Sequence, residues 1–337
     1  MFDFYQLANL FGAKDAHLTV SFGFDNKYLD YGKILLRSIQ ENSPNIQVKA
    51  LAINVAEGSL AEFAGCSNVE IIHEHKQFNH PYEQRLYSIV RRIFLIHELR
   101  HDPSVENLLQ LDADLIIRKD LNRFGRLFEQ GDMCLTARLK MKHEALRLMA
   151  GILGLSNTPA AKALTQEWIT QLWNLLESPQ DSKYIDQLTL WKAYEKVHAE
   201  QRLKLVNLQA PYIGRTGNTA IRVFAATKDA KGDKELLKEL NQYADKVLED
   251  APSNAPKQPE QKDIFLERGL VLNLFEKAGF IESKAGAVLT ANNEVVNGQS
   301  ETNVPGRAAL PNLSVVGERV DLGGVPAYPQ LLGSFSS

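Results

Sequence analysis

Asp112 and Asp114, two aspartates one residue apart, are the side chains of this 337-residue chain that most suggest a divalent-cation site. Apolar runs at 107–111 and 115–117 flank them, which predicts that they lie at the end of a buried strand. Clustered carboxylates repel one another unless a cation lies between them, and their hard oxygens suit Mg²⁺ or Mn²⁺. About one Asp-x-Asp is expected by chance in a chain of this length, so the surrounding residues decide its meaning.

The overall composition is that of an ordinary globular protein, with 44% hydrophobic and 23% charged residues. The formal net charge is −3 and no long basic tract occurs, so electrostatics give nucleic-acid binding no support. The two cysteines, Cys66 and Cys134, are too few for a disulfide framework or a zinc site. We expect both to be reduced thiols in the core.

The first residues of the chain lack the basic start and the apolar core of a signal peptide. No apolar run approaches the roughly 20 residues that a membrane-spanning helix needs. The sequence therefore predicts a cytoplasmic protein without a transmembrane segment.

Short apolar runs alternate with segments of helical periodicity, which predicts an α/β fold with a largely parallel sheet. In such a sheet ligands collect beyond the carboxyl ends of the strands, and Asp25 and Asp112 both follow predicted strands. The expected strands are 17–22, 47–53, 69–72, 107–111, 133–137, 203–208 and 220–225. The expected helices are 28–39, 82–99, one that starts at Pro159, 184–196, and one that ends near 248.

An apolar segment at 150–158, punctuated by glycines, precedes the helix that starts at Pro159. Trp168 lies at helical spacing with leucines on that helix, so we interpret it as a core residue and not as a sugar-stacking group. Prolines and small polar residues at 251–259 indicate a linker. One further helix is expected at 264–278, followed by a tail to which no fold is assigned.

Six short motifs follow one another in a fixed order between residues 17 and 235. They are 20–28, 87–95, Asp112 to Asp114, 151–155, Asp186-Gln187 and Lys231-Gly232. In this order they resemble the GT-A glycosyltransferases, and most of all the retaining families typified by glycogenin and the bacterial galactosyltransferases. The resemblance implies a Rossmann-like GT-A domain with a mostly parallel central sheet. We therefore predict a glycosyltransferase domain at 1–250, a linker at 251–262, and a C-terminal helix with an irregular extension at 263–337.

The resemblance also implies a metal-dependent hexosyltransferase that uses a nucleotide-diphosphate donor, a UDP-sugar above all. Asp112 would be shared between metal, ribose and sugar, and Asp114 would be a direct ligand of Mn²⁺ or Mg²⁺. The family usually supplies a late histidine as third ligand, and Asp229 occupies the comparable place here. An aspartate can coordinate the same cations, but Asp229 in a charged loop is equally compatible with an ordinary surface residue.

Other positions in the motifs would bind the remaining parts of the donor. Asp25 and Tyr28 would hold the nucleoside, and Lys231 would lie near the diphosphate. Arg91 and Arg92 point about 100° apart on a helix, so at most one is expected to face the donor, and Arg92 matches the family better. The alternative for both arginines is a solvated helix face.

The resemblance places three further residues beside the sugar. Gly151 would line the sugar pocket, Asp186 would bind sugar hydroxyls, and Gln187 would lie near the β face of a sugar transferred with retention. The alternative for Asp186 is a helix cap, which is a frequent role of aspartate. The usual Asn-Ser-Gly of the pocket segment is absent, which leaves the donor sugar open.

Two other functions remain open. A sugar-nucleotide nucleotidyltransferase shares this sheet topology, but it needs a glycine-rich basic loop after the first strand, and 23–27 has one glycine and no arginine. A non-catalytic, glycosyltransferase-like binding module is the other alternative. His73, His75 and His80 are interpreted as a polar loop and not as a metal site. The acceptor, whether a protein, a glycan, a lipid or a nucleic-acid base, cannot be derived from the sequence.

Overall fold

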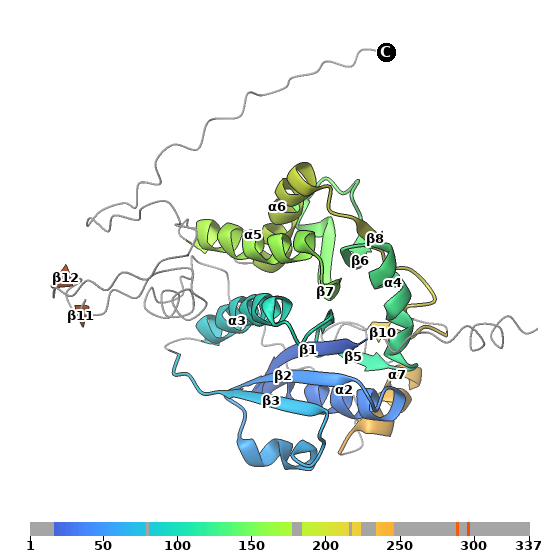
Figure 1. The fold of residues 1–337 in the computed structure, drawn as a ribbon. Coiled ribbons are helices and arrows are strands. Elements are labelled where there is room, and N and C mark those ends of the chain that lie inside the picture. Colours follow the sequence, from blue (N-terminus) through green and yellow to red (C-terminus); the bar gives the residue numbers. More distant parts are fainter. Residues whose placement is uncertain are drawn as a thin grey trace, which may run out of the picture. The chain divides into compact units, whose positions relative to one another are not determined.

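The computed structural model describes residues 17–78, 81–176, 184–215, 218–223 and 234–245, together with the backbone of 288–289 and 295–296. Its main sheet has seven strands in the order β3-β2-β1-β4-β7-β6-β8 (Figure 1). Only β7 runs against the others, because β7 pairs antiparallel with β4 and β6 while the remaining pairs are parallel. The predicted α/β fold with a mostly parallel sheet is confirmed. The strands are β1 (Leu18–Asp25), β2 (Gln47–Ile53), β3 (Val69–Glu74), β4 (Asn107–Leu111), β6 (Met133–Ala137), β7 (Leu148–Leu155) and β8 (Leu205–Asn207).

Strand β7 was not predicted from the sequence. Glycines are unfavourable in strands, so Gly151 and Gly154 obscure the apolar pattern by which a strand is predicted. Both glycines have close neighbours: a Cβ atom at Gly154 would lie 2.3 Å from the sulfur of Cys134 on β6. The strand therefore uses glycine where a side chain would collide with the next strand.

A second, smaller sheet has the order β5-β10-β9. Strand β5 (Leu115–Ile117) pairs antiparallel with β10 (Ile221–Val223), which pairs parallel with β9 (Ile213–Gly214). The strand predicted at 220–225 thus belongs to this sheet and not to the main one, and β9 was not predicted. Since β5 begins three residues after Asp112, the second sheet fixes the chain on the far side of the Asp-x-Asp motif.

The helices begin where the expected breakers stand. The hydroxyl of Thr158 accepts a hydrogen bond from the backbone of Ala161 at 3.2 Å, and Pro159 takes the first helical position of α5. No helix in the described ranges is long and apolar enough to span a membrane. The helices are α2 (Leu29–Asn42), α3 (Pro81–His101), α4 (Gly125–Gln130), α5 (Pro159–Leu176), α6 (Ile185–Gln201) and α7 (Lys234–Tyr243). Short 3₁₀ turns are η1 (Asn26–Tyr28), η2 (Glu57–Phe63), η3 (Leu121–Phe124) and η4 (Glu144–Leu146).

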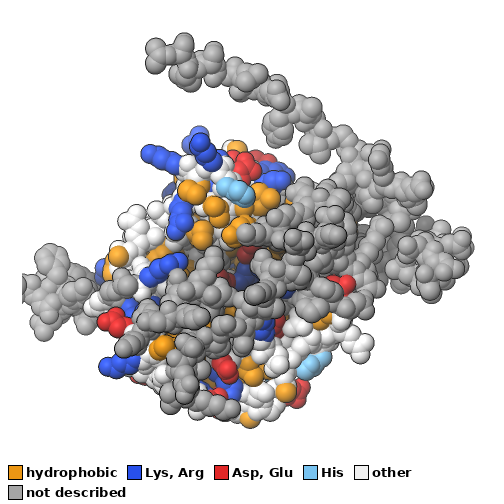
Figure 2. Space-filling view, turned by 180° about the vertical axis from the view of Figure 1, so that it is seen from behind, with side chains coloured by type: hydrophobic (Ala, Val, Ile, Leu, Met, Phe, Trp, Pro, Cys, Tyr) orange, Lys and Arg blue, Asp and Glu red, His pale blue; other side chains and the backbone are white. Residues whose placement is uncertain are grey.

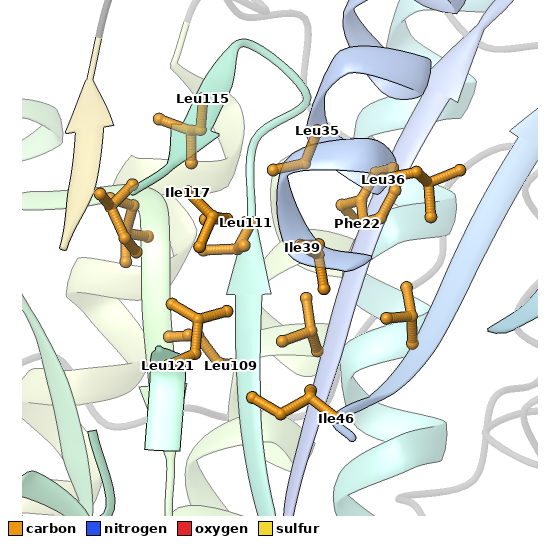
Figure 3. Packing of buried hydrophobic residues seen from close by; sticks show 14 of the residues in the cluster. Phe22, Leu35, Leu36, Ile39, Ile46, Leu109, Leu111, Leu115, Ile117 and Leu121 are labelled. Atoms are coloured by element: carbon orange, nitrogen blue, oxygen red, sulfur yellow. The ribbon is translucent and has the colours of Figure 1, made fainter. Parts of the chain in front are cut away.

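Helices cover the main sheet on both faces, with α2 on one side and α3 on the other (Figure 1). Figure 3 shows Leu35, Leu36 and Ile39 of α2 packed against Phe22 of β1 and Leu111 of β4. All five side chains are at most 1% exposed, so this layer is a dry core that holds β1 and β4 side by side. Because successive side chains of a strand point to opposite faces, the neighbouring residue Ser21 on β1 faces α3 instead.

Helix α5 carries the predicted core residues. Trp168 is 1% exposed, and Leu164, Leu172 and Leu175 are buried with it, which confirms their interpretation as core. Both cysteines are free thiols. Cys134 is buried as expected, but Cys66 is only partly buried, because it follows η2 in a surface turn.

The chain divides into two compact units, 1–271 and 272–337. In the second unit, the structure describes one antiparallel pair, β11 (Val288–Leu289) with β12 (Val295–Val296). The predicted linker at 251–262 and the predicted helix at 264–278 lie outside the described residues. The boundaries proposed at 250 and 263 therefore stay predictions.

Candidate functional site

The strand order creates a place where ligands can bind. The chain leaves β1 toward β2 and β3 on one side, and it returns to form β4 on the other side of β1. A crevice forms beyond the carboxyl ends of the strands at such a switch point. Asp25 is the last residue of β1, and Asp112 directly follows β4, which pairs with β1 through Phe22 and Leu111. The two aspartates therefore lie at the same edge of the sheet, on neighbouring strands.

Arg92 joins Asp112 to Asp186. From α3 its Nη1 donates to Oδ1 of Asp112, and its Nη2 donates to Oδ2 of Asp186 at 2.8 Å. The side chains of Arg92 and Asp186 are 16% and 14% exposed, whereas that of Asp112 is 37% exposed. One cation on α3 thus joins the end of β4 to the start of α6, and Asp112 is the carboxylate of this group that solvent or a ligand can reach.

The charges of this group depend on one another. Burial raises the pKa of Asp186, Arg92 opposes this shift, and Asp112 adds to it. Burial alone would lower the pKa of Arg92, but the two carboxylates outweigh burial and raise it. The guanidinium therefore stays charged, and it compensates two carboxylates that would otherwise repel one another.

Gly151 of β7 lies against Asp112. The backbone N–H of Asp112 donates to the carbonyl of Gly151 at 2.7 Å. A Cβ atom at Gly151 would lie 2.6 Å from Oδ2 of Asp112, closer than real Cβ atoms approach other atoms. Only glycine at 151 leaves the second oxygen of Asp112 in its place.

The start of α6 is held from two sides. The indole N–H of Trp168 donates to the carbonyl of Asp186 at 3.1 Å and to the hydroxyl of Thr189 at 2.9 Å. Tyr184, directly before α6, has a left-handed φ of 63°, an unusual conformation for a bulky residue. Against the effect of burial, hydrogen bonds from the backbone amides of Gln187 and Asp186 lower the pKa of the Asp186 carboxyl. This carboxylate therefore interacts both with the first backbone amides of α6 and with Arg92.

Gln187 faces the connection between β6 and β7. With its amide nitrogen turned toward them, Gln187 donates to the carbonyls of Ala145 at 2.9 Å and Leu148 at 3.2 Å. These two bonds fix the side chain beside Asp186 and hold α6 against η4.

Both carboxylate oxygens of Asp25 accept hydrogen bonds from the protein. Its Oδ1 accepts from the backbone of Lys27 at 3.0 Å and of Tyr28 at 3.2 Å, and its Oδ2 accepts from Nε2 of Gln84 at 3.1 Å. Tyr28 is half-buried, and burial raises the pKa of its hydroxyl, with Asp114 as the next cause. Asp25, Tyr28 and Asp114 therefore form one side of the candidate site.

Arg91 points elsewhere. Its Nε donates to Glu74 of β3 at 2.7 Å, and its Nη1 donates to Glu98 at 3.1 Å. Of the two adjacent arginines the structure brings Arg92, and not Arg91, to Asp112.

The described residues contain no group of three or more His, Cys, Asp and Glu side chains that could hold a metal ion. Asp112 and Asp114 supply two carboxylates, and Asp229 and Lys231 lie outside the described residues. Mg²⁺ is usually held by one or two carboxylates and takes its other oxygens from phosphates and water. The pair therefore fits a cation that arrives with a diphosphate, although it does not form a closed protein site.

His73 and His75 stand apart from this site on and directly after β3. His73 lies on β3, and its ring stacks with that of His75 at 6.4 Å between centroids. His80 lies outside the described residues.

Three residues near the site were not predicted to take part. Gln84 binds Asp25, and Trp168 fixes the backbone of Asp186 from α5. Arg85 is exposed. Burial lowers the pKa of Lys27, Asp25 opposes this shift, and Arg85 adds to it. Only the position of Gln84 and Arg85 within one helical turn before the motif at 87–95 could have drawn attention to them.

No protein-family model matches this chain, and no curated protein matches its sequence. Solved structures do match. The galactosyltransferase LgtC, crystallised with donor and acceptor sugar analogs, is 13% identical with a TM-score of 0.46, and the match covers 68% of this chain and 98% of LgtC. The glycosyltransferase GlyE of Streptococcus pneumoniae TIGR4 is 15% identical with a TM-score of 0.40, over 58% of this chain and 45% of GlyE.

The bifunctional glycosyltransferase WbbM, in its apo form, is also 15% identical, with a TM-score of 0.41, over 59% of this chain and 40% of WbbM. This chain thus spans nearly all of LgtC but less than half of GlyE and of WbbM.

Proposed function

We propose that this protein is a glycosyltransferase of the hexosyl type. It transfers a sugar from a nucleotide-diphosphate donor, preferably a UDP-sugar, to an acceptor with retention. The observation that carries the proposal is the Arg92 bridge between Asp112 and Asp186 at the switch point of the sheet. The resemblance of the motif order to the GT-A glycosyltransferases supports the same function.

The nucleoside half of the donor would lie beyond β1. Asp25 ends that strand and caps η1, and Tyr28 is the last residue of η1, near Asp114. Because Asp25 is already held by backbone amides and by Gln84, it would bind the donor as a rigid acceptor group. Tyr28 would offer a ring face for the base.

The diphosphate would lie at Asp112 and Asp114. A bound Mn²⁺ or Mg²⁺ would offset the negative charge that grows on the departing diphosphate. Asp112 and Asp114 would hold this ion, while Arg92 keeps Oδ1 of Asp112 in position. Asp229 as third oxygen ligand and Lys231 as a phosphate-binding cation complete the proposal.

The sugar would lie between Gly151 and the start of α6. Asp186 would accept hydrogen bonds from sugar hydroxyls, and Gln187 would lie near the anomeric carbon. Transfer breaks the bond between that carbon and the diphosphate oxygen and forms a bond to an acceptor oxygen on the same face. The acceptor proton then passes to the departing diphosphate, so no protein base is required.

Thermal unfolding in the presence of nucleotide tests the donor and metal sites together. UDP with Mn²⁺ is expected to raise the melting temperature of the protein, and Asp114→Ala is expected to abolish this rise. An unchanged response in Asp114→Ala would remove that residue from the metal site. Release of pyrophosphate from UTP and a sugar phosphate would instead identify a nucleotidyltransferase.

A further inference from the structure

The connection between β6 and β7 exposes apolar side chains among cations. All residues from 138 to 144 are exposed. Leu139 and Met141 are 48% and 37% exposed, and with Tyr184 they are the exposed large hydrophobics of the part that the structure describes. Arg138, Lys140 and Lys142 alternate with them. We call residues 138–143 the basic apolar segment.

This segment has a defined shape. The backbone N–H of Arg138 donates to the carbonyl of Arg147 at 2.7 Å, which closes the base of the connection. The Nε of Arg147 donates to the carbonyl of Met141 at 2.9 Å, and its guanidinium lies 4.7 Å above the ring of Trp191 on α6. The exposed side chains therefore stand on a braced loop, and their exposure is a property of the fold.

The segment is positively charged in a chain whose net charge is −3. No described carboxylate forms an ion pair with Arg138, Lys140 or Lys142. The exposed Glu144 follows the segment. Burial raises the pKa of Glu195 on α6, and the Glu144 carboxylate adds to this shift by like-charge repulsion. Helix α6 and this connection lie at the upper end of Figure 1, and at the same end of Figure 2 Lys and Arg side chains surround hydrophobic ones.

A surface of this kind matches one partner in particular. Cations are attracted to anionic headgroups, and apolar side chains beside them can enter the interface of a bilayer. A site for single-stranded nucleic acid would be expected to carry Phe, Tyr or Trp rings on which bases stack, and the segment contains none of these three residues. We propose that the basic apolar segment docks on an anionic lipid surface, with Leu139 and Met141 in the interface and the three cations at the headgroups.

The docking proposal is independent of the proposed reaction, because none of these side chains belongs to the Arg92 site. The two are nevertheless close in the fold, since Gln187 is bonded to the carbonyls of Ala145 and Leu148, just after the segment. Docking would therefore present the start of α6 to the membrane surface.

Sedimentation of the full chain with vesicles tests the proposal. Binding is expected to vesicles of phosphatidylcholine with about one third phosphatidylserine, and not to phosphatidylcholine alone, and it should fall as salt is added. Because each basic residue near such a surface contributes about fivefold in affinity, Lys140→Glu with Lys142→Glu should weaken binding at least about 25-fold. Leu139→Ser with Met141→Ser should weaken it about tenfold.

The matched control is Lys204→Glu with Lys238→Glu, which changes the same charge at two exposed lysines on other elements and should bind like the wild type. A second measurement places an environment-sensitive dye on Met141→Cys in a Cys66→Ser background. The dye should shift to the blue with anionic vesicles, whereas a dye on Lys238→Cys should not. Equal binding to neutral vesicles, equal loss in the control pair, no shift at position 141, or binding to RNA without binding to vesicles would each overturn the proposal.

Discussion

Arg92 and Asp186 are 94 residues apart in the chain, and their side chains form an ion pair of 2.8 Å. The same guanidinium binds Asp112, so it ties the start of α6 to the end of β4. In the proposed reaction Asp186 would bind the sugar and Asp112 the metal, and this link would let both act on one donor.

Replacement of Arg92 should disable the site. In Arg92→Ala the carboxylates of Asp112 and Asp186 would face one another without their cation, and Asp186 is nearly buried. Since small displacements of catalytic groups are costly, we expect turnover of a nucleotide-sugar to fall at least about 100-fold. The loss of one partner of a mostly buried ion pair should also lower the free energy of unfolding by about 3 kcal/mol, as measured with urea.

Arg91→Ala is the matched control, because Arg91 pairs with Glu74 and Glu98 away from the site. It should change turnover by less than about threefold, since Arg91 is buried to a similar extent as Arg92 but binds Glu74 and Glu98 and neither Asp112 nor Asp186. Equal losses in the two variants would show that Arg92 acts only through the stability of α3.

Gly151→Ala should interfere with Asp112 alone. The new Cβ would lie 2.6 Å from Oδ2 of Asp112, which would have to move. We expect weaker binding of UDP with Mn²⁺ by calorimetry, by about tenfold, for a displacement of this kind. Gly58→Ala is the control, because a Cβ there has no neighbour within 4 Å. Unchanged binding in Gly151→Ala would mean that Oδ2 of Asp112 does not touch the ligand.

Helix α3 should be destabilised by acid through His97. Burial lowers the pKa of His97 to about 3, with His101 as the second cause. The native state thus stays unprotonated at a pH where the unfolded chain binds a proton. The stability that follows is fully present above about pH 6.5 and is lost as the pH falls toward 3.

Between pH 7 and pH 5 this effect should lower the free energy of unfolding by about 2 kcal/mol. In His97→Gln, which keeps a polar group near the hydroxyl of Thr165, that part of the pH dependence should disappear. The measurement is urea denaturation at both pH values. The same slope with pH in wild type and variant would contradict the assignment.

The two thiols should react at very different rates. Burial raises the pKa of Cys134 to about 12, while Cys66 is partly exposed. A thiolate-specific reagent at pH 8 should therefore modify one thiol per chain quickly and the second only after denaturation. Rapid modification of both thiols in the wild type, or of any thiol in Cys66→Ser, would be inconsistent with the buried position of Cys134.

Sequence patterns predicted most of the sheet, because β1, β2, β4 and β6 are short apolar runs between breakers. They did not reveal β7, because glycines are unfavourable in strands. Gly151 and Gly154 are needed only because a Cβ atom would collide with Asp112 and Cys134 in the folded protein. The bridge from Arg92 to Asp186 was also invisible, because nothing in either segment specifies a partner so far along the chain.

Hydrogen bonds between residues far apart in the sequence account for the other differences. Asp25 follows a strand as predicted, yet its carboxylate is held by Gln84 and by η1, contacts that depend on how α3 crosses the strand end. Gln187 is bonded to backbone carbonyls, which no residue pattern encodes.

In the proposed function, Asp112 and its neighbours bind a nucleotide-sugar and weaken its bond to the sugar. The most direct test incubates the full chain with a panel of UDP- and GDP-sugars and Mn²⁺, without acceptor, and measures the free nucleotide diphosphate. We expect slow hydrolysis of at least one UDP-sugar, and its loss in Asp112→Asn while the chain stays folded. No hydrolysis of any sugar nucleotide by the wild type, or equal hydrolysis by Asp112→Asn, would contradict it.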